Sequence, residues 1–319
     1  MKSKSAAAVQ PKKPFSWKRF GRKVVNQRYL FLLCIPAILI VGIFHYGAIY
    51  GITVAFKDYS PRLGITGSPW LDPWYKNIEL FFQNTASWTL LKNTFVLGFT
   101  NMLFNFPAPI IFALLLNELR NGPFKRTVQT ISYIPHFITV VVIVGMLNEF
   151  GAKDGLFNHI TALFGADPIV FTNGPDYFLP MYVGSSLWQG VGYGSIIYLS
   201  ALSNVDPTLY DVAAIDGANR WQKCWNIAWP TIRPTTTILL IMQAGNVFAA
   251  DFQKVILMQN DTNRAAVDVI QSYVYREGIQ GARFEYTTAV NLFLSVISFI
   301  VVFAANKVTQ ILDRDNSLW

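Results

Sequence analysis

Charged residues are scarce in this 319-residue sequence. Asp, Glu, Lys and Arg make up 14% of it, whereas a soluble domain carries about 25%. Cysteine and histidine are rarer still, with two and three residues. Cys34 and Cys224 lie in segments of different character and fit no metal spacing, so we expect neither a disulfide nor a metal site. His45, His136 and His159 have no carboxylate at a useful spacing. We therefore expect no catalytic residue.

Nucleotide-binding and catalytic motifs are also missing. No segment matches the glycine-rich loop with Lys and Ser or Thr that cradles nucleotide phosphates. Gly190, Gly192 and Gly194 lie inside an apolar run, not at a strand–helix turn, and Gly190 and Gly194 have the spacing that lets helices approach closely. A membrane enzyme, such as a glycosyl- or acyltransferase, would need clustered Asp, Glu or His, and no such cluster is visible. The chain is not expected to hydrolyse ATP by itself or to bind a cofactor.

The charge deficit is concentrated in six runs without any charged residue. Each has about 17–29 residues, which is enough for a helix to cross a hydrocarbon core of ~30 Å. The composition agrees, with 52% hydrophobic residues and a mean hydropathy of +0.33. We therefore predict an all-α, polytopic membrane protein with six transmembrane helices. The runs are 29–56, 94–117, 127–148, 177–205, 234–250 and 286–306.

The basic residues predict the orientation of these spans. Six spans place both termini on one side, and that side would hold 17 of the 26 Lys and Arg residues. The excess indicates that both termini are cytoplasmic. Residues 1–28 carry nine basic residues and no acidic one, which favours topology determination and contact with anionic lipid over nucleic-acid binding. We expect a basic arm over 1–28, a transmembrane domain over 29–309 and a cytoplasmic tail over 310–319.

A polar segment, residues 206–230, interrupts the membrane pattern between the fourth and fifth runs. It contains residue types that begin or end helices. Asp206 and Pro207 begin a first helix, and Gly217 ends it. Asn219 caps a second helix over 220–227, and Pro230 starts the fifth span. We predict a helix, a glycine turn and a second helix on the cytoplasmic side.

A spacing motif runs through the same segment. In order, it contains Asp211-Val212-Ala213, Gly217, Ile227 and Trp229-Pro230. This spacing resembles the cytoplasmic loop of permease subunits of binding-protein-dependent sugar ABC importers. The motif of that family is Glu-Ala-Ala, three residues, Gly, nine residues, Ile, one residue and Leu-Pro. The spacing is intact, while Asp replaces Glu, Val replaces the first Ala and Trp replaces Leu.

Other segments resemble one branch of that family, which imports oligosaccharides derived from polysaccharides such as alginate and pectin. The resemblance covers about residues 25–319, and residues 71–76 depart from the branch. The segments that carry it are 56–61, 64–70, 259–260, 272–278 and 317–319.

The resemblance implies the type I ABC importer permease fold in a bacterial cytoplasmic membrane. A second, non-identical permease subunit would complete the path, and an extracytoplasmic binding protein would deliver an oligosaccharide. Two ATPase subunits, which hold ATP and Mg, would dock at residues 206–230. No nucleic acid is implied as a partner. The residues implied to couple to the ATPase are Asp211, Val212, Ala213, Gly217, Ile227 and Pro230.

Neutral hydrogen-bonding and aromatic side chains suit pyranose rings, and six such residues lie in the fourth and fifth runs. Packing or hydrogen bonding between helices is the alternative role for each. The candidates for a substrate path are Trp188, Gln189, Tyr193, Tyr198, Gln243 and Asn246. We also expect Pro107, Pro109 and Pro135 to kink or break their helices, and Asp251 and Lys254, three residues apart, to neutralise each other near the outer boundary.

Two alternatives stay open on the sequence. A permease for another solute delivered by a binding protein would share the 206–230 motif. A stand-alone secondary transporter would need ionisable residues inside its spans as proton or ion relays, and the six runs contain almost none. The absence of a relay and of an energy source within the chain favours an externally driven permease.

Overall fold

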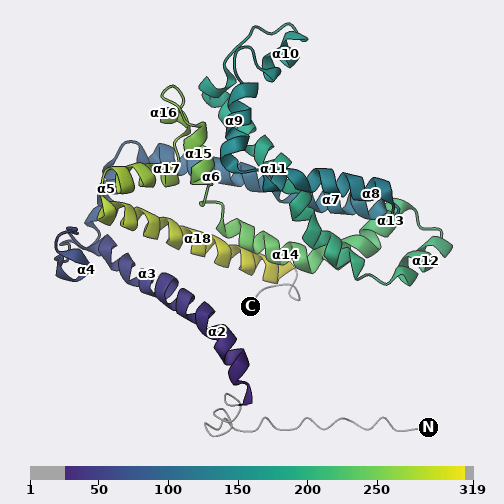
Figure 1. Ribbon diagram of the computed structural model, residues 1–319, viewed down its shortest axis with the longest axis horizontal. Helices are drawn as coiled ribbons and strands as arrows, with labels where there is room; N and C mark the ends of the chain where they lie inside the picture. Colours follow the sequence, from purple (N-terminus) through teal and green to yellow (C-terminus); the bar gives the residue numbers. More distant parts are fainter. Residues whose placement is uncertain (1–25, 313–319) are drawn as a thin grey trace. The chain divides into compact units, whose positions relative to one another are not determined.

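The computed structural model describes residues 26–312, and helices form most of this part of the chain (Figure 1). No β-strand occurs within the described range, where one antiparallel bridge joins Lys57 to Trp70. Most of the basic arm predicted over 1–28 and most of the predicted tail lie outside the described residues. The contacts between residues divide the chain into two units, residues 1–53 and residues 54–319.

The first unit contains a long apolar helix that breaks into four pieces. None of the residues of α2 is buried, although the whole stretch from Arg28 to Phe56 is long and apolar enough to span a membrane. The pieces are α2 (Arg28–Val41), η1 (Gly42–Tyr46), α3 (Gly47–Ile49) and η2 (Tyr50–Phe56), the last of which continues into the second unit.

The second unit begins with short helices and continues with the predicted second, third and fourth runs. Proline opens α7, α8 and α11, a position where its missing N–H leaves no helical hydrogen bond unmade. These elements are α4 (Gly64–Gly67), α5 (Lys76–Gln83), α6 (Ser87–Asn105), α7 (Pro107–Glu118), α8 (Pro123–Tyr133), η3 (Ile134–Phe137), α9 (Val140–Phe150), α10 (Leu156–Ala162), η4 (Phe171–Asn173) and α11 (Pro175–Ser203).

The remainder of the second unit holds the polar segment and the last two runs. The elements are α12 (Pro207–Ile215), α13 (Arg220–Lys223), η5 (Cys224–Ala228), α14 (Trp229–Gly245), α15 (Phe252–Met258), α16 (Arg264–Val267), α17 (Ile270–Val274), η6 (Tyr275–Gln280) and α18 (Phe284–Leu312). Within this unit α12 and α13 project at one end, whereas α5 and α17 lie at the other end (Figure 1).

Helix α11 is the centre of the second unit. It packs against α6, α7, α8 and α14, and α14 packs in turn against α18. Two buried apolar clusters contain residues of α11, and a third joins α5, α6, α17 and α18. One cluster joins α7 and α11 to the start of α14, and it contains Ile110, Ala113, Tyr198, Leu202 and Ile232. Because this cluster lies directly beside residues 206–230, it fixes both ends of that segment to the bundle.

Most residues of each of the six predicted runs lie in helices. Within residues 26–312 three helices are long and apolar enough to cross a membrane by themselves, spanning Arg28–Phe56, Ser87–Glu118 and Phe284–Ile311. The third run forms a pair of helices bent by 97° between Phe137 and Val140. This break confirms the expectation for Pro135. The second run is interrupted at Phe106, directly before Pro107, although α6 and α7 together form one candidate span from Ser87 to Glu118. Helix α11 contains many Gly and Ser residues and α14 has 17 residues, so neither meets the same criterion.

The ends of two helices differ from the ends of the charge-free runs. The second span begins at Ser87 and not at residue 94. The fifth run was expected to extend to residue 250, but α14 ends at Gly245 and Asn246 is its C-cap. Charged and polar residues can lie inside a helix wherever they face water or a headgroup, so the limits of a charge-free run do not mark the ends of the helix.

Close helix approach also occurs at a different glycine from the expected pair. A Cβ atom at Gly192 would lie 2.0 Å from the carbonyl oxygen of Ser132 in α8, whereas one at Gly190 would have nothing within 4 Å. Gly194 lies near Pro109, with 3.0 Å between its Cβ position and Cγ of the proline. The backbone contact between α11 and α8 therefore requires glycine at position 192.

Candidate functional site

The first helix of the 206–230 segment begins as the sequence predicts. Asp206 is the N-cap of α12, and its Oδ1 accepts a hydrogen bond of 2.9 Å from the backbone N–H of Thr208. This hydrogen bond holds the pKa of the Asp206 carboxyl below its usual range, because it favours the charged form. Pro207 occupies the first turn. The helix start is thus specified locally and needs no tertiary contact.

The turn after α12 depends on Gly217. Its φ of 79° lies in the left-handed region that favours glycine. The backbone N–H of Ala218 donates to the carbonyl of Ala213 at 2.8 Å, and that of Gly217 donates to Ala214 at 3.1 Å. These two bonds form a Schellman motif that closes the helix. A side chain at Gly217 would meet nothing within 4 Å, so the requirement for glycine is conformational and not steric.

The second helix starts with a reciprocal cap. The backbone N–H of Gln222 donates to Oδ1 of Asn219 at 2.9 Å, and the N–H of Asn219 donates to Oε1 of Gln222 at 2.8 Å. This capping box satisfies two amide groups that the helix leaves free. The predicted cap at Asn219 is confirmed.

Pro230 lies in the first turn of α14, as predicted for a proline at the start of the fifth run. Helix α13 continues through the π-helical turn η5 directly into α14, and the residues at both junctions have helical backbone angles. Proline lacks an N–H donor and normally disrupts the hydrogen bonds of the preceding turn, and the wider π-helical turn lies just before Pro230. One continuous helical rod therefore runs from the Gly217 turn to Gly245 and joins the segment mechanically to the fifth run.

One side of α12 is exposed and apolar. Leu209, Val212 and Ile215 are spaced three residues apart and are 52%, 55% and 86% exposed. Asp211 is exposed and Ala213 is half-buried beside them. Such a face on an otherwise polar segment is typical of a surface that another protein covers. The sequence motif identified Val212, but not the two apolar neighbours; their spacing along the helix was the available signal.

The other side of the segment is attached to the bundle. The side-chain amide of Asn117 in α7 donates to the hydroxyl of Tyr210 at 3.3 Å. Ile227 is half-buried, and the hydroxyl of Thr231 donates to its carbonyl at 2.8 Å. Ala228 is buried in the cluster beside α7, and Pro230 is exposed. The attachment holds α12 with its apolar face outward.

Three of the candidates for the substrate path make contacts between helices or within the core. The side-chain amide of Gln189 donates to the carbonyl of Ile138 at 2.9 Å, a carbonyl freed by the break in the third run. The ring of Tyr193 stacks on His136, with centroids 3.7 Å apart. Tyr198 is 3% exposed inside the cluster beside α7, which leaves its ring no face for a sugar.

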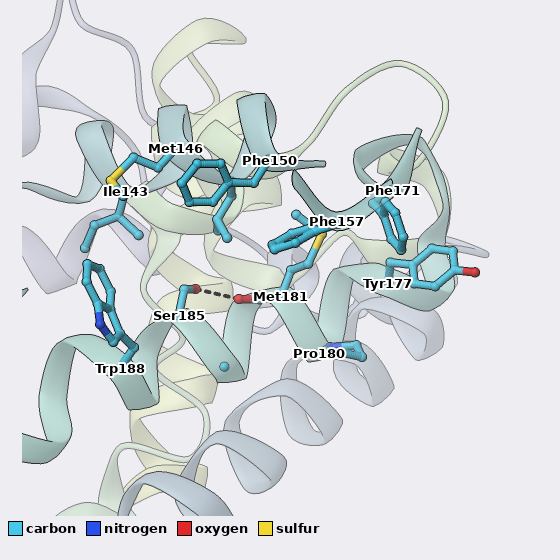
Figure 2. A pocket seen from close by; sticks show the side chains of 12 residues that line it. Ile143, Met146, Phe150, Phe157, Phe171, Tyr177, Pro180, Met181, Ser185 and Trp188 are labelled. Carbon is cyan, nitrogen blue, oxygen red and sulfur yellow. Dashed lines mark hydrogen bonds between the residues drawn. The ribbon is translucent and has the colours of Figure 1, made fainter. Parts of the chain in front are cut away.

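The other three path candidates have different surroundings. Trp188 is 46% exposed and lines a cavity of about 460 Å³ between α9 and α11. The walls of this cavity are almost wholly apolar (Figure 2), with Ile143, Met146 and Phe150 facing Met181 across it. Its polar Ser185 already donates to the carbonyl of Met181. Gln243 is half-buried and Asn246 is exposed. An apolar wall of this kind does not match sugar hydroxyl groups.

The expected ion pair between Asp251 and Lys254 was wrong. The Asp251 carboxylate instead caps α15, where it accepts from the backbone N–H groups of Gln253 and Lys254. Lys254 is 2% exposed, and its ammonium donates to the carbonyl of Tyr182 at 3.1 Å and to the hydroxyl of Ser186 at 2.7 Å. This buried ammonium fastens α15 to α11. Among residues 26–312 no group of three or more His, Cys, Asp and Glu could hold a metal ion.

The described residues form an all-helical protein whose polar segment presents an exposed apolar helix face. The family comparison gives the particular class. Residues 105–315 match the family of binding-protein-dependent transport system inner membrane components, and the chain belongs to that family. It is therefore a permease component of a transport system and not an enzyme.

The relatives support the same fold along nearly the whole chain. Protein LplB of Bacillus subtilis (strain 168) is 38% identical over 98% of this chain and 98% of its own length. The polygalacturonan/rhamnogalacturonan transport system permease protein YteP of the same organism is 38% identical over 92% of this chain and 91% of its own. A chain of a bacterial ABC transporter that imports the acidic polysaccharide alginate superposes with a TM-score of 0.83 at 33% identity, covering 92% of this chain and 99% of that chain. A chain of a bacterial alginate ABC transporter solved in complex with an alginate pentasaccharide-bound periplasmic protein is also 33% identical, with a TM-score of 0.83. The chain thus has the fold of an ABC importer permease.

Proposed function

We propose that this chain forms half of the translocation path for oligosaccharides delivered by an extracytoplasmic binding protein. A second, non-identical permease subunit supplies the other half, and two ATPase subunits, which hold ATP and Mg, drive transport. The six helical runs cross the cytoplasmic membrane and both termini are cytoplasmic. The observation that carries the proposal is the geometry of residues 206–230, where an exposed apolar helix face is joined to a transmembrane helix by one rod.

The structure suggests how force would pass from the ATPase to the path. The ATPase covers Leu209, Val212 and Ile215 on α12, with the Asp211 carboxylate available for a basic residue. Movement of α12 is transmitted in two ways. The Asn117–Tyr210 hydrogen bond connects it to α7, and the rod from α13 to α14 carries it to the fifth run.

The substrate class rests on the relatives. YteP is named for polygalacturonan and rhamnogalacturonan, and the superposed permease belongs to an alginate importer. Both names refer to polysaccharides rich in uronic acids, and both proteins match more than nine-tenths of this chain. Oligosaccharides from such polymers are therefore the proposed cargo.

Co-expression with the partner subunits tests the docking of the ATPase. Ile215→Ser removes the most exposed apolar side chain of α12, and we expect it to reduce both the amount of ATPase that copurifies with the permease and the uptake of oligosaccharide. Leu163→Ser is the matched control, since Leu163 is 83% exposed on a different loop. Normal copurification of the ATPase with Ile215→Ser and normal uptake would exclude docking at this face. Uptake without any ATPase would instead indicate a secondary transporter.

A further inference from the structure

A polar pocket lies where α15, α16 and η6 meet, in the same unit as the 206–230 segment but at a distance from it along the bundle (Figure 1). Its volume is about 200 Å³, which is below the ~300–1,000 Å³ of pockets for drug-sized ligands. The space suits a single sugar residue. We call it the α15–α16–η6 pocket; its polar walls are Gln259, Asn260, Asp261, Arg264, Tyr275, Arg276 and Gln280.

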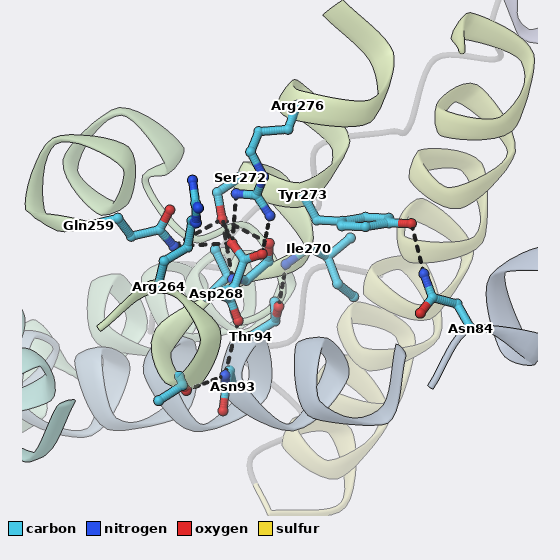
Figure 3. A network of polar contacts seen from close by, with 12 residues as sticks. Asn84, Asn93, Thr94, Gln259, Arg264, Asp268, Ile270, Ser272, Tyr273 and Arg276 are labelled. Carbon is cyan, nitrogen blue, oxygen red and sulfur yellow. Dashed lines mark hydrogen bonds and ion pairs between the residues drawn. The ribbon is translucent and has the colours of Figure 1, made fainter. Parts of the chain in front are cut away.

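One wall of the pocket is held in place by a buried carboxylate (Figure 3). Asp268 is 8% exposed and binds the guanidinium of Arg276 through both of its oxygens. The side-chain amide of Gln259 donates to the same carboxylate at 3.1 Å. Asn93 in α6 donates to the backbone carbonyls of Asp268 and Ala266, at 3.0 and 2.8 Å. The positive charge of Arg276 is therefore neutralised, and the wall is rigid before any ligand binds.

The charge of Arg264 is held much more loosely. Its Nη2 lies 3.6 Å from Oδ1 of Asp261, and the two side chains are 50% and 99% exposed. An ion pair of this kind is weak and exchanges easily for a better partner. Within the described part of the chain, neither the side-chain amide of Gln280 nor the hydroxyl of Tyr275 makes a hydrogen bond. The pocket thus offers a ligand the loosely held guanidinium of Arg264, the side-chain amide of Gln280 and the hydroxyl of Tyr275.

This combination matches the chemistry of a uronic acid. A guanidinium binds a carboxylate through two parallel charge-assisted hydrogen bonds, and a side-chain amide and a phenol can bind sugar hydroxyls. The Tyr275 ring, which packs 5.8 Å from that of Phe252, provides an apolar edge. We propose that the α15–α16–η6 pocket is a subsite for one uronic acid residue of the transported oligosaccharide, whose carboxylate displaces Asp261 from Arg264. The inference rests on the proposed function.

Direct binding to the assembled transporter tests the subsite. The complete complex in nanodiscs is titrated with free alginate pentasaccharide and with the same pentasaccharide after reduction of its carboxyl groups, and binding is followed by saturation-transfer NMR. We expect Arg264→Gln to weaken binding of the acidic sugar about tenfold, the usual size of a charge-assisted hydrogen bond, without changing binding of the reduced sugar. Arg264→Lys keeps the charge but not the paired hydrogen bonds, so it should restore only part of the affinity.

Arg283→Gln is the matched control. Arg283 is 47% exposed and pairs with Glu277 at 2.9 Å, but it does not line the pocket, so both sugars should bind as they do to the wild type. Equal binding of the acidic sugar to wild type and Arg264→Gln, or no preference of the wild type for the acidic sugar, would overturn the subsite. So would a loss of uptake in Arg264→Gln with unchanged sugar binding, because Arg264 would then contact the binding protein. Uptake of the oligosaccharide by the wild-type complex, measured in parallel, tests the proposed function separately from the subsite.

Discussion

The crossing of α11 and α8 at Gly192 gives the sharpest prediction of stability. The substitution Gly192→Ala places a methyl carbon 2.0 Å from the carbonyl oxygen of Ser132 and 2.4 Å from its carbonyl carbon. Both of these are backbone atoms of α8, so no rotation of a side chain can relieve the clash. The two helices must separate by more than 1 Å to restore ordinary van der Waals contact.

That separation has a cost that can be worked out roughly. Overpacking of a tight interface costs about 1–3 kcal/mol. Nearby contacts would be weakened as well, because Gln189 and Tyr193 lie on the same side of α11 and bind Ile138 and His136. The matched variant is Gly190→Ala, where the new methyl group meets nothing within 4 Å. Replacing glycine by alanine inside a helix should stabilise that variant by about 0.5–1 kcal/mol.

Thermal unfolding of the purified protein in detergent compares the two variants. We expect Gly192→Ala to lower Tm and Gly190→Ala to leave it unchanged or raise it, with a difference of about 3 °C or more between them. Equal Tm values would refute the close approach of α11 and α8. A lower Tm for Gly190→Ala than for Gly192→Ala would support the spacing motif of Gly190 and Gly194 instead.

Three further predictions follow from local contacts. Asp268→Asn should destabilise the protein by about 3–5 kcal/mol because it breaks a buried ion pair. Glu277→Gln, at an exposed ion pair, should change stability by less than about 1 kcal/mol. The Tm values of the two variants test this difference. The cap at Asp206 has a lowered pKa, so its contribution is present above the ordinary Asp pKa of about 3.9 and lost as the pH falls through the lowered value. The Tm difference between wild type and Asp206→Ala should therefore vanish in strong acid, and a constant difference would contradict this. In a cysteine-free background, Leu163→Cys should react with a membrane-impermeant maleimide in intact cells and Ile215→Cys only after permeabilisation; the opposite pattern would reverse the topology.

The helix caps and the turn of residues 206–230 could be predicted from the sequence alone. Asp206, Gly217 and Asn219 act through hydrogen bonds and backbone angles within a few residues of themselves, so their roles as caps and turn could be predicted without tertiary contacts. The exposed apolar face of α12 could be predicted only in part from the sequence. The motif marked Val212, but exposure of Leu209 and Ile215 depends on which side Tyr210 attaches to α7.

Contacts between distant segments explain the errors. Lys254 was paired with Asp251 because they are three residues apart, yet its ammonium binds Tyr182 and Ser186 in α11. Which polar group a buried side chain meets depends on the packing of two helices, and a single sequence does not contain that information. The same reason applies to Tyr198, which the tertiary packing places in the core.

The scarcity and spacing of charge determined by themselves that this chain is a helical membrane protein, because an uncharged run of sufficient length is stable in lipid only as a helix. The caps and the spacing of residues 206–230 determined the family resemblance. Tertiary structure alone decided that the glycine at 192 and not at 190 meets α8, that the ammonium of Lys254 binds α11, and that Tyr198 lies in the core. Each of these depends on distances between residues far apart in the chain, which follow from how the helices pack.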